Sequence, residues 1–218
     1  MGTSFKNEVV ITLNNTIELS GELVIPEGAT GIVIFSHGSG SSRFSSRNKM
    51  VARRLQENRI GTLLFDLLTP EEDRDYATRF NIDLLTQRLV ATTQWLEHFQ
   101  PAQHYGIGYF GASTGAASAL KAAAVLPQIK AVISRGGRPD LAMDALDRVQ
   151  APTLLIVGSL DAKVLQLNDM AYQGLSCIKM LEVVEGATHL FSEQGKLDVV
   201  ANLAVDWCRK YISEIPAS

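Results

Sequence analysis

The chain has 218 residues, of which 46% are apolar and 20% are charged. This composition is typical of a globular protein, and the length predicts a single domain over residues 1–218, because α/β folds often reach this size undivided. The 20 basic and 23 acidic residues give a net charge of -3. No strong positive field is therefore available to attract nucleic acid or an anionic membrane, and we expect neither as a partner.

The N-terminal segment and the cysteines bear on location. The segment MGTSFKNEVVITLNN lacks the apolar core of a signal peptide, and no apolar run approaches the ~20 residues of a membrane helix. Cys177 and Cys208 are too few for a disulfide framework or a zinc site. Both stand in stretches that predict buried secondary structure, so we expect buried thiols, a reducing compartment and a cytoplasmic location.

The first predicted elements are strands. Segments 9–13 and 17–25 alternate or run apolar around Asn14-Asn15, a pair suited to a tight hairpin turn. Six short segments rich in β-branched residues then predict strands buried on both faces. They are GIVIFSHG, GTLLFDLL, HYGIGYFG, KAVISRGG, TLLIVGSLD and MLEVVEG.

Helical periods separate these strands. They are clearest at 81–99 and at 200–211, where apolar residues recur every three or four positions. A leading hairpin followed by repeated strand–helix units predicts an α/β fold, with a mostly parallel sheet and helices on both faces. Segments 69–79 and 136–150 fit neither pattern. We expect them to be loops over the C-terminal edge of the sheet, too short to form a large cap domain.

The strongest chemical motif is Gly111-Ala112-Ser113-Thr114-Gly115, between the strand HYGIGYFG and an Ala-rich helical segment. This is the context that a nucleophile elbow requires. A sharp strand-to-helix turn exposes the serine oxygen, and small residues beside it let the two backbones pass closely. The alternative is an ordinary Gly/Ser helix start, but the context favours Ser113 as a nucleophile.

A serine nucleophile needs a base, and the chain has four histidines. Only His189 follows the last predicted strand, on a loop that would reach the same sheet edge as Ser113. The alternative role for His189 is to cap the final helix. The positions of His37, His98 and His104 fit a general base less well.

The orienting acid should hold the imidazole in the correct tautomer. Asp161 ends TLLIVGSLD, directly after the strand that precedes the one leading to His189. Asp140 and Asp144 on the previous loop are rivals, and Asp161 could instead cap the next helix. The predicted triad is therefore Ser113, Asp161 and His189, in that chain order.

Stabilising a tetrahedral intermediate requires donors aimed at the oxyanion. The backbone N–H of Thr114 is one candidate by position, and the N–H of Ser39 in the glycine-rich HGSGSS is the other. The alternative for this loop is a phosphate cradle. We disfavour it because the loop lacks both the GxxxxGK[ST] lysine and the G-x-G-x-x-G spacing.

Arginines flank the predicted site. Arg43 and Arg47 follow the glycine-rich loop, and Arg135 and Arg138 lie in SRGGRPD after a strand. Guanidinium groups there could pair with an anionic substrate, with Arg43, Arg135 and Arg138 as the candidate binding residues. The alternative is salt bridges with acidic neighbours such as Asp140, or exposure to water.

Together, the HGSG loop, the elbow at mid-chain, the VGSLD acid turn and the GATH histidine turn resemble the α/β-hydrolase superfamily, and within it the dienelactone hydrolase-like group. The resemblance covers the whole chain. It implies an eight-stranded core sheet, no cofactor or metal, and hydrolysis of small carboxylic esters or lactones through an acyl-enzyme. The elbow of dienelactone hydrolase itself resembles G-x-C-x-G, in which the nucleophile is a cysteine. This sequence has Ser113 at that position.

Two alternatives to esterase chemistry stay open at this point. A thioesterase, an amidase or an acyltransferase would use the same triad, and the sequence does not separate them. A non-catalytic scaffold that only binds a ligand belongs to a different class, because fold does not dictate function. The presence of all three triad residues disfavours it.

Overall fold

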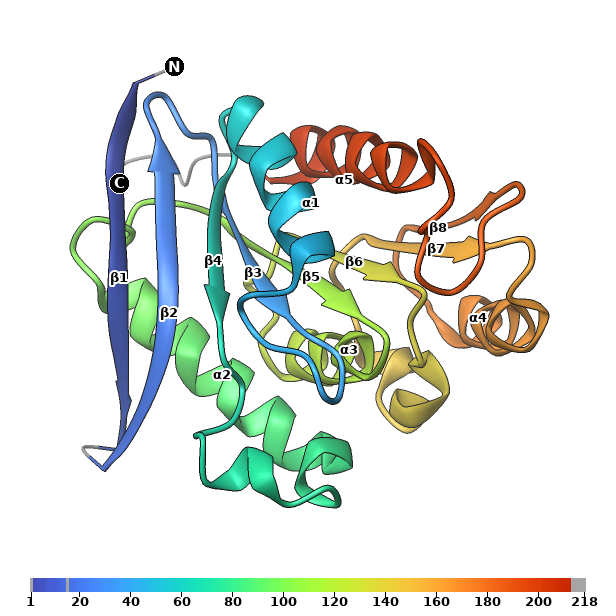
Figure 1. The fold of residues 1–218 in the computed structure, drawn as a ribbon, viewed down its shortest axis with the longest axis horizontal. Coiled ribbons are helices and arrows are strands. Elements are labelled where there is room, and N and C mark those ends of the chain that lie inside the picture. Colours follow the sequence, from blue (N-terminus) through green and yellow to red (C-terminus); the bar gives the residue numbers. More distant parts are fainter. Residues whose placement is uncertain (1, 15, 213–218) are drawn as a thin grey trace.

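The computed structural model describes residues 2–14 and 16–212, which contain an eight-stranded sheet (Figure 1). The strands lie in the order β1-β2-β4-β3-β5-β6-β7-β8. The β1–β2 and β2–β4 pairs are antiparallel, and every other neighbouring pair is parallel. The predicted mostly parallel sheet is thus confirmed. Its strands are β1 (Thr3–Leu13), β2 (Ile17–Pro26), β3 (Ile32–Ser36), β4 (Gly61–Phe65), β5 (Ile107–Ala112), β6 (Ala131–Arg135), β7 (Thr153–Gly158) and β8 (Lys179–Val184).

The N-terminal hairpin also forms as predicted. Leu13 pairs with Ile17, and Asn14 has the positive φ of +50° that suits a tight turn, whereas Asn15 lies outside the described residues. The first strand begins at Thr3, six residues before the predicted start at residue 9. That part of β1 is largely exposed on an edge strand, so no apolar alternation marked it.

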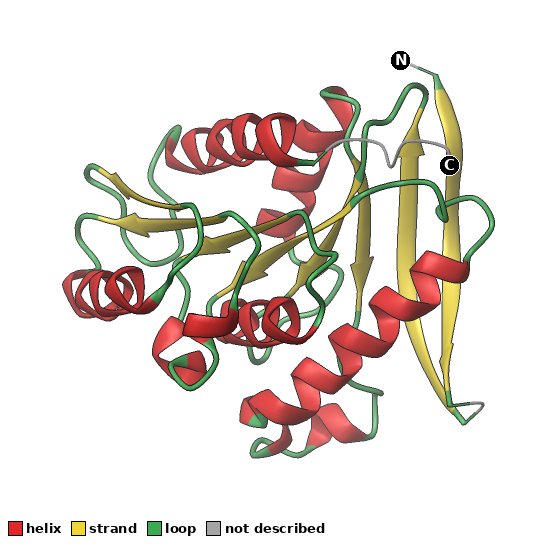
Figure 2. Cartoon of the chain, turned by 180° about the vertical axis from the view of Figure 1, so that it is seen from behind, coloured by secondary structure: helices red, strands yellow, loops and turns green. Residues whose placement is uncertain are grey.

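Helices cover both faces of the sheet (Figures 1 and 2). On one face lie α1 (Ser46–Glu57) and α5 (Lys196–Tyr211), and on the other lie α2 (Ile82–His98), α3 (Thr114–Val125) and α4 (Ala162–Gly174). Among the described helices, none has the length and apolarity that crossing a bilayer would require. The two faces therefore bury two separate hydrophobic layers.

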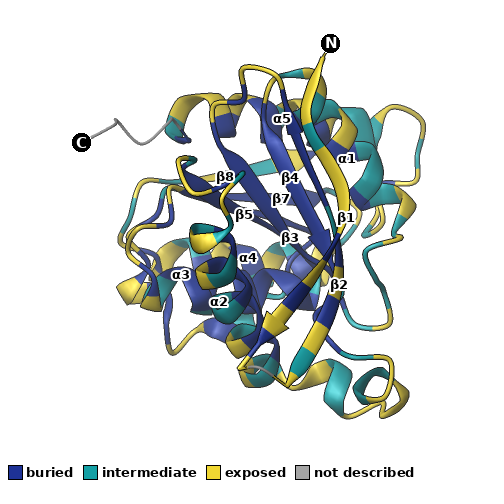
Figure 3. Ribbon diagram, turned by 90° about the vertical axis from the view of Figure 1, so that its left-hand side faces the viewer, coloured by how far each residue is buried: buried dark blue, intermediate teal, exposed yellow. Residues whose placement is uncertain are grey.

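The central strands carry the core, and Figure 3 shows them buried while β1 is largely exposed. Each of β3 to β7 is buried along its whole length, as their β-branched composition predicted. On α5, the predicted stripe supplies Val200, Ala204, Trp207 and Cys208 to the layer beneath α1 and α5. A rigid, buried sheet therefore supports the loops at its C-terminal edge.

The prediction for one cysteine was wrong. Cys208 is a buried thiol in α5, but Cys177 is half-buried in the loop between α4 and β8. Its thiol lies 3.7 Å from the hydroxyl of Thr153. The helix ends at Gly174, and the apolar residues around Cys177 belong to the turn that leads into the sheet rather than to a regular element.

The two irregular segments follow β4 and β6, as expected. Each contains short 3₁₀ turns, at Glu72–Arg74 and Thr78–Phe80 in the first and at Pro139–Ala142 and Leu146–Arg148 in the second. Neither forms a separate cap over the sheet (Figure 1). The C-terminal ends of the strands are left for a surface pocket.

Candidate active site

A strained turn carries Ser113 between β5 and α3. Its φ of +53° and ψ of -122° are unusual for a residue with a side chain, and such a conformation costs on the order of 1–3 kcal/mol. Three backbone hydrogen bonds hold it: the N–H of Ser113 donates to the carbonyl of Arg135, and its own carbonyl accepts from Ala116 and Arg138. The turn is therefore fixed by its neighbours, as a nucleophile elbow requires.

Close approach of neighbouring backbone segments requires both glycines of this turn. A Cβ on Gly111 would lie 2.4 Å from the Cα of Ala116, and a Cβ on Gly115 would lie 2.1 Å from the carbonyl oxygen of Ser36. Both distances are far below van der Waals contact. Only glycine lets α3 start so close to β3 and β5.

His189 and Asp161 are brought together at the same edge. The Nδ1 of His189 lies 2.6 Å from an oxygen of Asp161. Asp161 occupies the N-cap position of α4, yet its side chain makes no capping hydrogen bond. Helix α5 is capped at Gly195, not at His189. Neither residue has the capping role that was its alternative.

The rival acids face other partners. Asp140 makes two hydrogen bonds with the guanidinium of Arg138, both 2.8 Å long. Asp144 pairs with Lys121 at 3.4 Å. Of the three candidate acids, Asp161 is the one that contacts His189.

One pocket, with a volume of about 190 Å³, is lined by Ser113, His189, Ser39 and Arg135 among the predicted site residues. We call Gly38, Ser39, Ser113 and His189 its catalytic wall, and Ser41, Ser45, Arg47, Asn48 and Arg135 its arginine wall. Among the described residues, no hydrogen bond joins the hydroxyl of Ser113 to His189. An unbound site often shows such a loose contact, which tightens when substrate is present.

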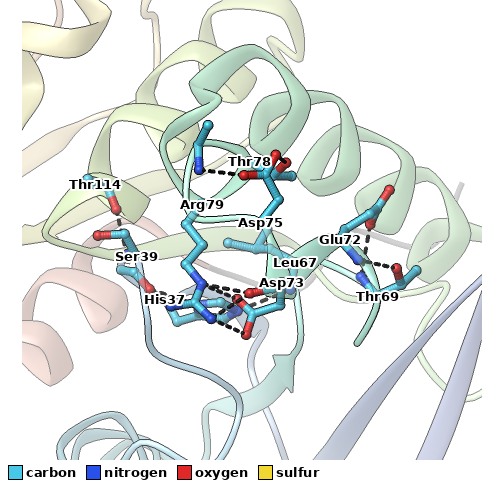
Figure 4. Close-up of polar contacts among 12 residues, drawn as sticks. His37, Ser39, Leu67, Thr69, Glu72, Asp73, Asp75, Thr78, Arg79 and Thr114 are labelled. Atoms are coloured by element: carbon cyan, nitrogen blue, oxygen red, sulfur yellow. Dashed lines mark hydrogen bonds and ion pairs between the residues drawn. The ribbon is translucent and has the colours of Figure 1, made fainter.

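The loop after β3 lies against the elbow. A Cβ on Gly38 would lie 3.1 Å from the Cβ of Ser113. The N–H of Ser39 donates to the side-chain oxygen of Thr114 at 2.8 Å (Figure 4). No pattern in the sequence indicates this bond. The N–H of Ser39, one of the two predicted oxyanion donors, is thus bonded to the side chain of Thr114. The backbone N–H of Thr114 is the other predicted donor.

His37 is part of the framework of this loop. It is buried, its Nε2 accepts from the N–H of Leu67 at 3.1 Å, and its Nδ1 lies 3.0 Å from the carbonyl of Gly38 (Figure 4). Burial lowers the pKa of His37. The ring is therefore neutral, with the proton on Nδ1, and donates to the oxyanion loop.

Two of the three predicted substrate-binding arginines have acidic partners. Arg43 pairs with Asp66 and also lies 3.7 Å from Glu8, and it borders a different pocket from Ser113. Arg138 is held by Asp140. For these two residues, the structure supports the salt-bridge alternative.

Arg135 differs from both. It ends β6 on the same face as Ala131 and Ile133, beneath α1 and α5, and lines the pocket that contains Ser113. Arg47, near the start of α1, lines the same pocket. Arg47 was not among the three predicted binding residues, although its position after the glycine-rich loop could have indicated it.

The described residues offer no clear metal site. Across residues 2–14 and 16–212, no three side chains of the His, Cys, Asp and Glu types come close enough to hold a metal ion.

The sheet order, the antiparallel start and the turn at Ser113 define an α/β-hydrolase fold. The sequence pattern of the Dienelactone hydrolase family matches residues 19–209, and the chain belongs to that family.

Solved structures agree with this assignment. The chain is similar to the crystal structure of dienelactone hydrolase from Anabaena variabilis, with 50% sequence identity and a TM-score of 0.93, covering 97% of this chain and 100% of that one. It shares its fold with Est1E from Butyrivibrio proteoclasticus, at 16% identity and a TM-score of 0.79, covering 93% and 98% of the two chains.

The curated relatives that match this chain are longer proteins. Two Mycobacterium tuberculosis proteins, named provisionally as phosphoribosyl transferases, are 52% identical over 203 residues. The match covers 93% of this chain but 46% of theirs, so this chain spans about half the length of these relatives. Their name describes the longer proteins.

Proposed function

We propose that this chain is a serine hydrolase that cleaves carboxylic esters or lactones of small molecules through an acyl-enzyme. The observation that carries the proposal is that Ser113, on its strained turn, lines one pocket together with His189, which is paired with Asp161. Membership of the dienelactone hydrolase family and the esterase-like fold support a hydrolase.

In the first step, Ser113 attacks the substrate carbonyl while Nε2 of His189 takes its proton. Asp161 accepts the hydrogen bond from Nδ1, which fixes the tautomer that leaves Nε2 free and stabilises the imidazolium as it forms. The step requires His189 to approach the Ser113 hydroxyl to within hydrogen-bond distance. His189 then protonates the leaving alcohol, and water repeats the cycle on the acyl-enzyme.

The oxyanion is stabilised by backbone donors. Thr114 is the first residue of α3, so its N–H has no partner within the helix and is available to the oxyanion. The N–H of Ser39 must exchange its bond to the Thr114 side chain for one to the oxyanion. The Thr114 hydroxyl thus holds the second donor in place until substrate arrives.

The bond that is cleaved separates the remaining candidates. Thioester hydrolysis, amide hydrolysis and acyl transfer would use the same three residues. A binding scaffold without activity would not need Ser113 to be nucleophilic.

We keep the cytoplasm as the proposed location, in line with the free thiols of Cys177 and Cys208.

A labelling and substrate panel tests the proposal. Purified protein should hydrolyse short-chain p-nitrophenyl esters faster than the matched thioesters and anilides, and a fluorophosphonate probe should label Ser113. Ser113→Ala should abolish labelling and turnover, whereas Ser192→Ala, at an exposed serine near His189, should retain both. Full labelling of Ser113→Ala would refute the assignment of the nucleophile, and a wild-type protein without turnover or labelling would favour the scaffold.

A further inference from the structure

The arginine wall holds two guanidinium groups without acidic partners. Among the described residues, neither Arg47 nor Arg135 makes a side-chain hydrogen bond or a salt bridge, and the Nε of each is buried without a partner. Arg135 is only 7% exposed. Burying a charged group without a partner is costly, so such a pair calls for an explanation.

Ion pairs within the chain do not explain why the Nε atoms of Arg47 and Arg135 are buried without partners. Arg43 lies on the same segment as Arg47, and Arg138 lies on the same segment as Arg135. Each of these two neighbours forms a salt bridge with a carboxylate. The residues that line the pocket of Arg47 and Arg135 include no Asp or Glu. The chain can neutralise arginines in this region, but it leaves this pair exposed to the pocket.

The two charges also act on one another. Burial, together with the charge of Arg47, lowers the pKa of Arg135 to about 10. Arg135 therefore stays protonated at neutral pH, where its charge repels that of Arg47. A monoanion would offset one of these charges, whereas a dianion would offset both.

The surroundings suit an oxyanion with several acceptor atoms. Ser41 and Ser45 line the same wall, and the Ser45 side chain caps the N-terminal turn of α1, whose twelve residues start at Ser46. The dipole of a helix favours negative charge at that end. Guanidinium forks bind two oxygens of a phosphate at once, and a phosphate held by them would lie in the same small pocket as the catalytic wall.

We propose that Arg47 and Arg135 form a subsite for a dianionic phosphate group, carried by the substrate next to its scissile ester or lactone. The identity of the scissile bond rests on the proposed function. The anion subsite does not, because it can be measured without turnover.

The first test measures binding alone. Inorganic phosphate is titrated calorimetrically into Ser113→Ala at pH 8, with chloride keeping the ionic strength constant. Adding Arg47→Gln or Arg135→Lys should weaken phosphate binding ~10- to 100-fold, the loss expected for one charge-assisted bidentate contact. Arg53→Gln is the matched control, because it removes an exposed arginine from the same helix and should leave the affinity unchanged.

The second test compares substrates on the protein with Ser113 intact. Three p-nitrophenyl esters of similar length carry a phosphonate, a carboxylate or a methyl group at the far end of the acyl chain. We expect kcat/KM to fall in that order, and Arg47→Gln should reduce the ratio of kcat/KM for the phosphonate ester to that for the methyl ester ~10-fold or more.

The outcomes separate the two proposals. Phosphate binding that depends on Arg47 and Arg135, without turnover of any ester, would keep the subsite and refute the proposed function. Turnover of the methyl ester with phosphate affinity unaffected by either substitution would do the reverse. A carboxylate ester preferred over the phosphonate would overturn the assignment to a dianion.

Discussion

The two walls of the pocket treat their polar groups in opposite ways. On the catalytic wall, His189 is held by Asp161, the Ser39 N–H by Thr114, and the Ser113 backbone by three hydrogen bonds. On the arginine wall, neither guanidinium has an acidic partner among the described residues. The difference fits the two proposed roles: a reacting group needs a fixed geometry and internal partners, whereas a guanidinium that is to neutralise a ligand must keep its charge unpaired until the ligand binds.

The largest expected effect comes from the nucleophile. Ser113→Ala should reduce kcat by ~10⁶ if the triad acts as a unit. Ser113→Gly should lose as much activity as Ser113→Ala. Its free energy of unfolding should be ~1 kcal/mol higher than that of Ser113→Ala, because glycine adopts a φ of +53° without strain. Kinetics and chemical denaturation measure the two effects. Equal stability of the two variants would show that the turn is not strained.

The next effect sharpens the role of the acid. Asp161→Asn should leave the fold intact and cut kcat by ~10⁴, since the amide can hold the wrong histidine tautomer. Asp140→Asn, which loosens Arg138, should cost far less. Steady-state kinetics of both variants decide the question, and the opposite ranking would move the acid to the loop after β6.

A third substitution tests the close packing behind the catalytic wall. Gly115→Ala places a Cβ 2.1 Å from a backbone oxygen of β3, and we expect the free energy of unfolding to fall by more than ~3 kcal/mol. Gly174→Ala is the control, because its Cβ would meet only side-chain atoms, none nearer than 3.4 Å. It should change stability by less than ~1 kcal/mol. Similar thermal denaturation of both variants would contradict this account of the elbow.

The smallest effect concerns pH. Because burial lowers the pKa of His37 from 6.5 in the folded protein, the unfolded chain takes up this proton first as the pH falls. The contribution of His37 to stability is complete above pH 6.5 and declines below it, by about 1.4 kcal/mol per pH unit until the folded pKa is reached.

Denaturation at several pH values measures this loss. His37→Gln should flatten the decline, because its amide oxygen can still accept from Leu67 but does not titrate. His98→Gln, at an exposed histidine, should retain it. An unchanged slope in His37→Gln would show that another group causes the acid sensitivity.

Much of the fold could be predicted because its signals are local. The β-branched segments that became β3 to β8, and the turn around Ser113, each carry their pattern within about ten residues. The pairing of His189 with Asp161 was also predictable, since parallel strands deliver their C-terminal loops to one edge.

The remaining features depend on contacts between distant segments. Arg43 pairs with Asp66, 23 positions along the chain, whereas Arg47 and Arg135 have no acidic partner among the described residues. Sequence spacing does not encode this difference. The bond from Ser39 to Thr114 likewise joins residues 75 positions apart, so no local pattern could indicate it.

The position of Ser113 at the end of β5 sets two different timescales within the site. Strand β5 is buried along its length between β3 and β6, so its amides should exchange with solvent deuterium only when the whole domain unfolds. His189 stands on a loop with its side chain 38% exposed, where exchange should be much faster. We therefore expect Ser113, the proposed nucleophile, to be the stationary member of the pair, and the loop that carries His189 to make the movement that closes the distance.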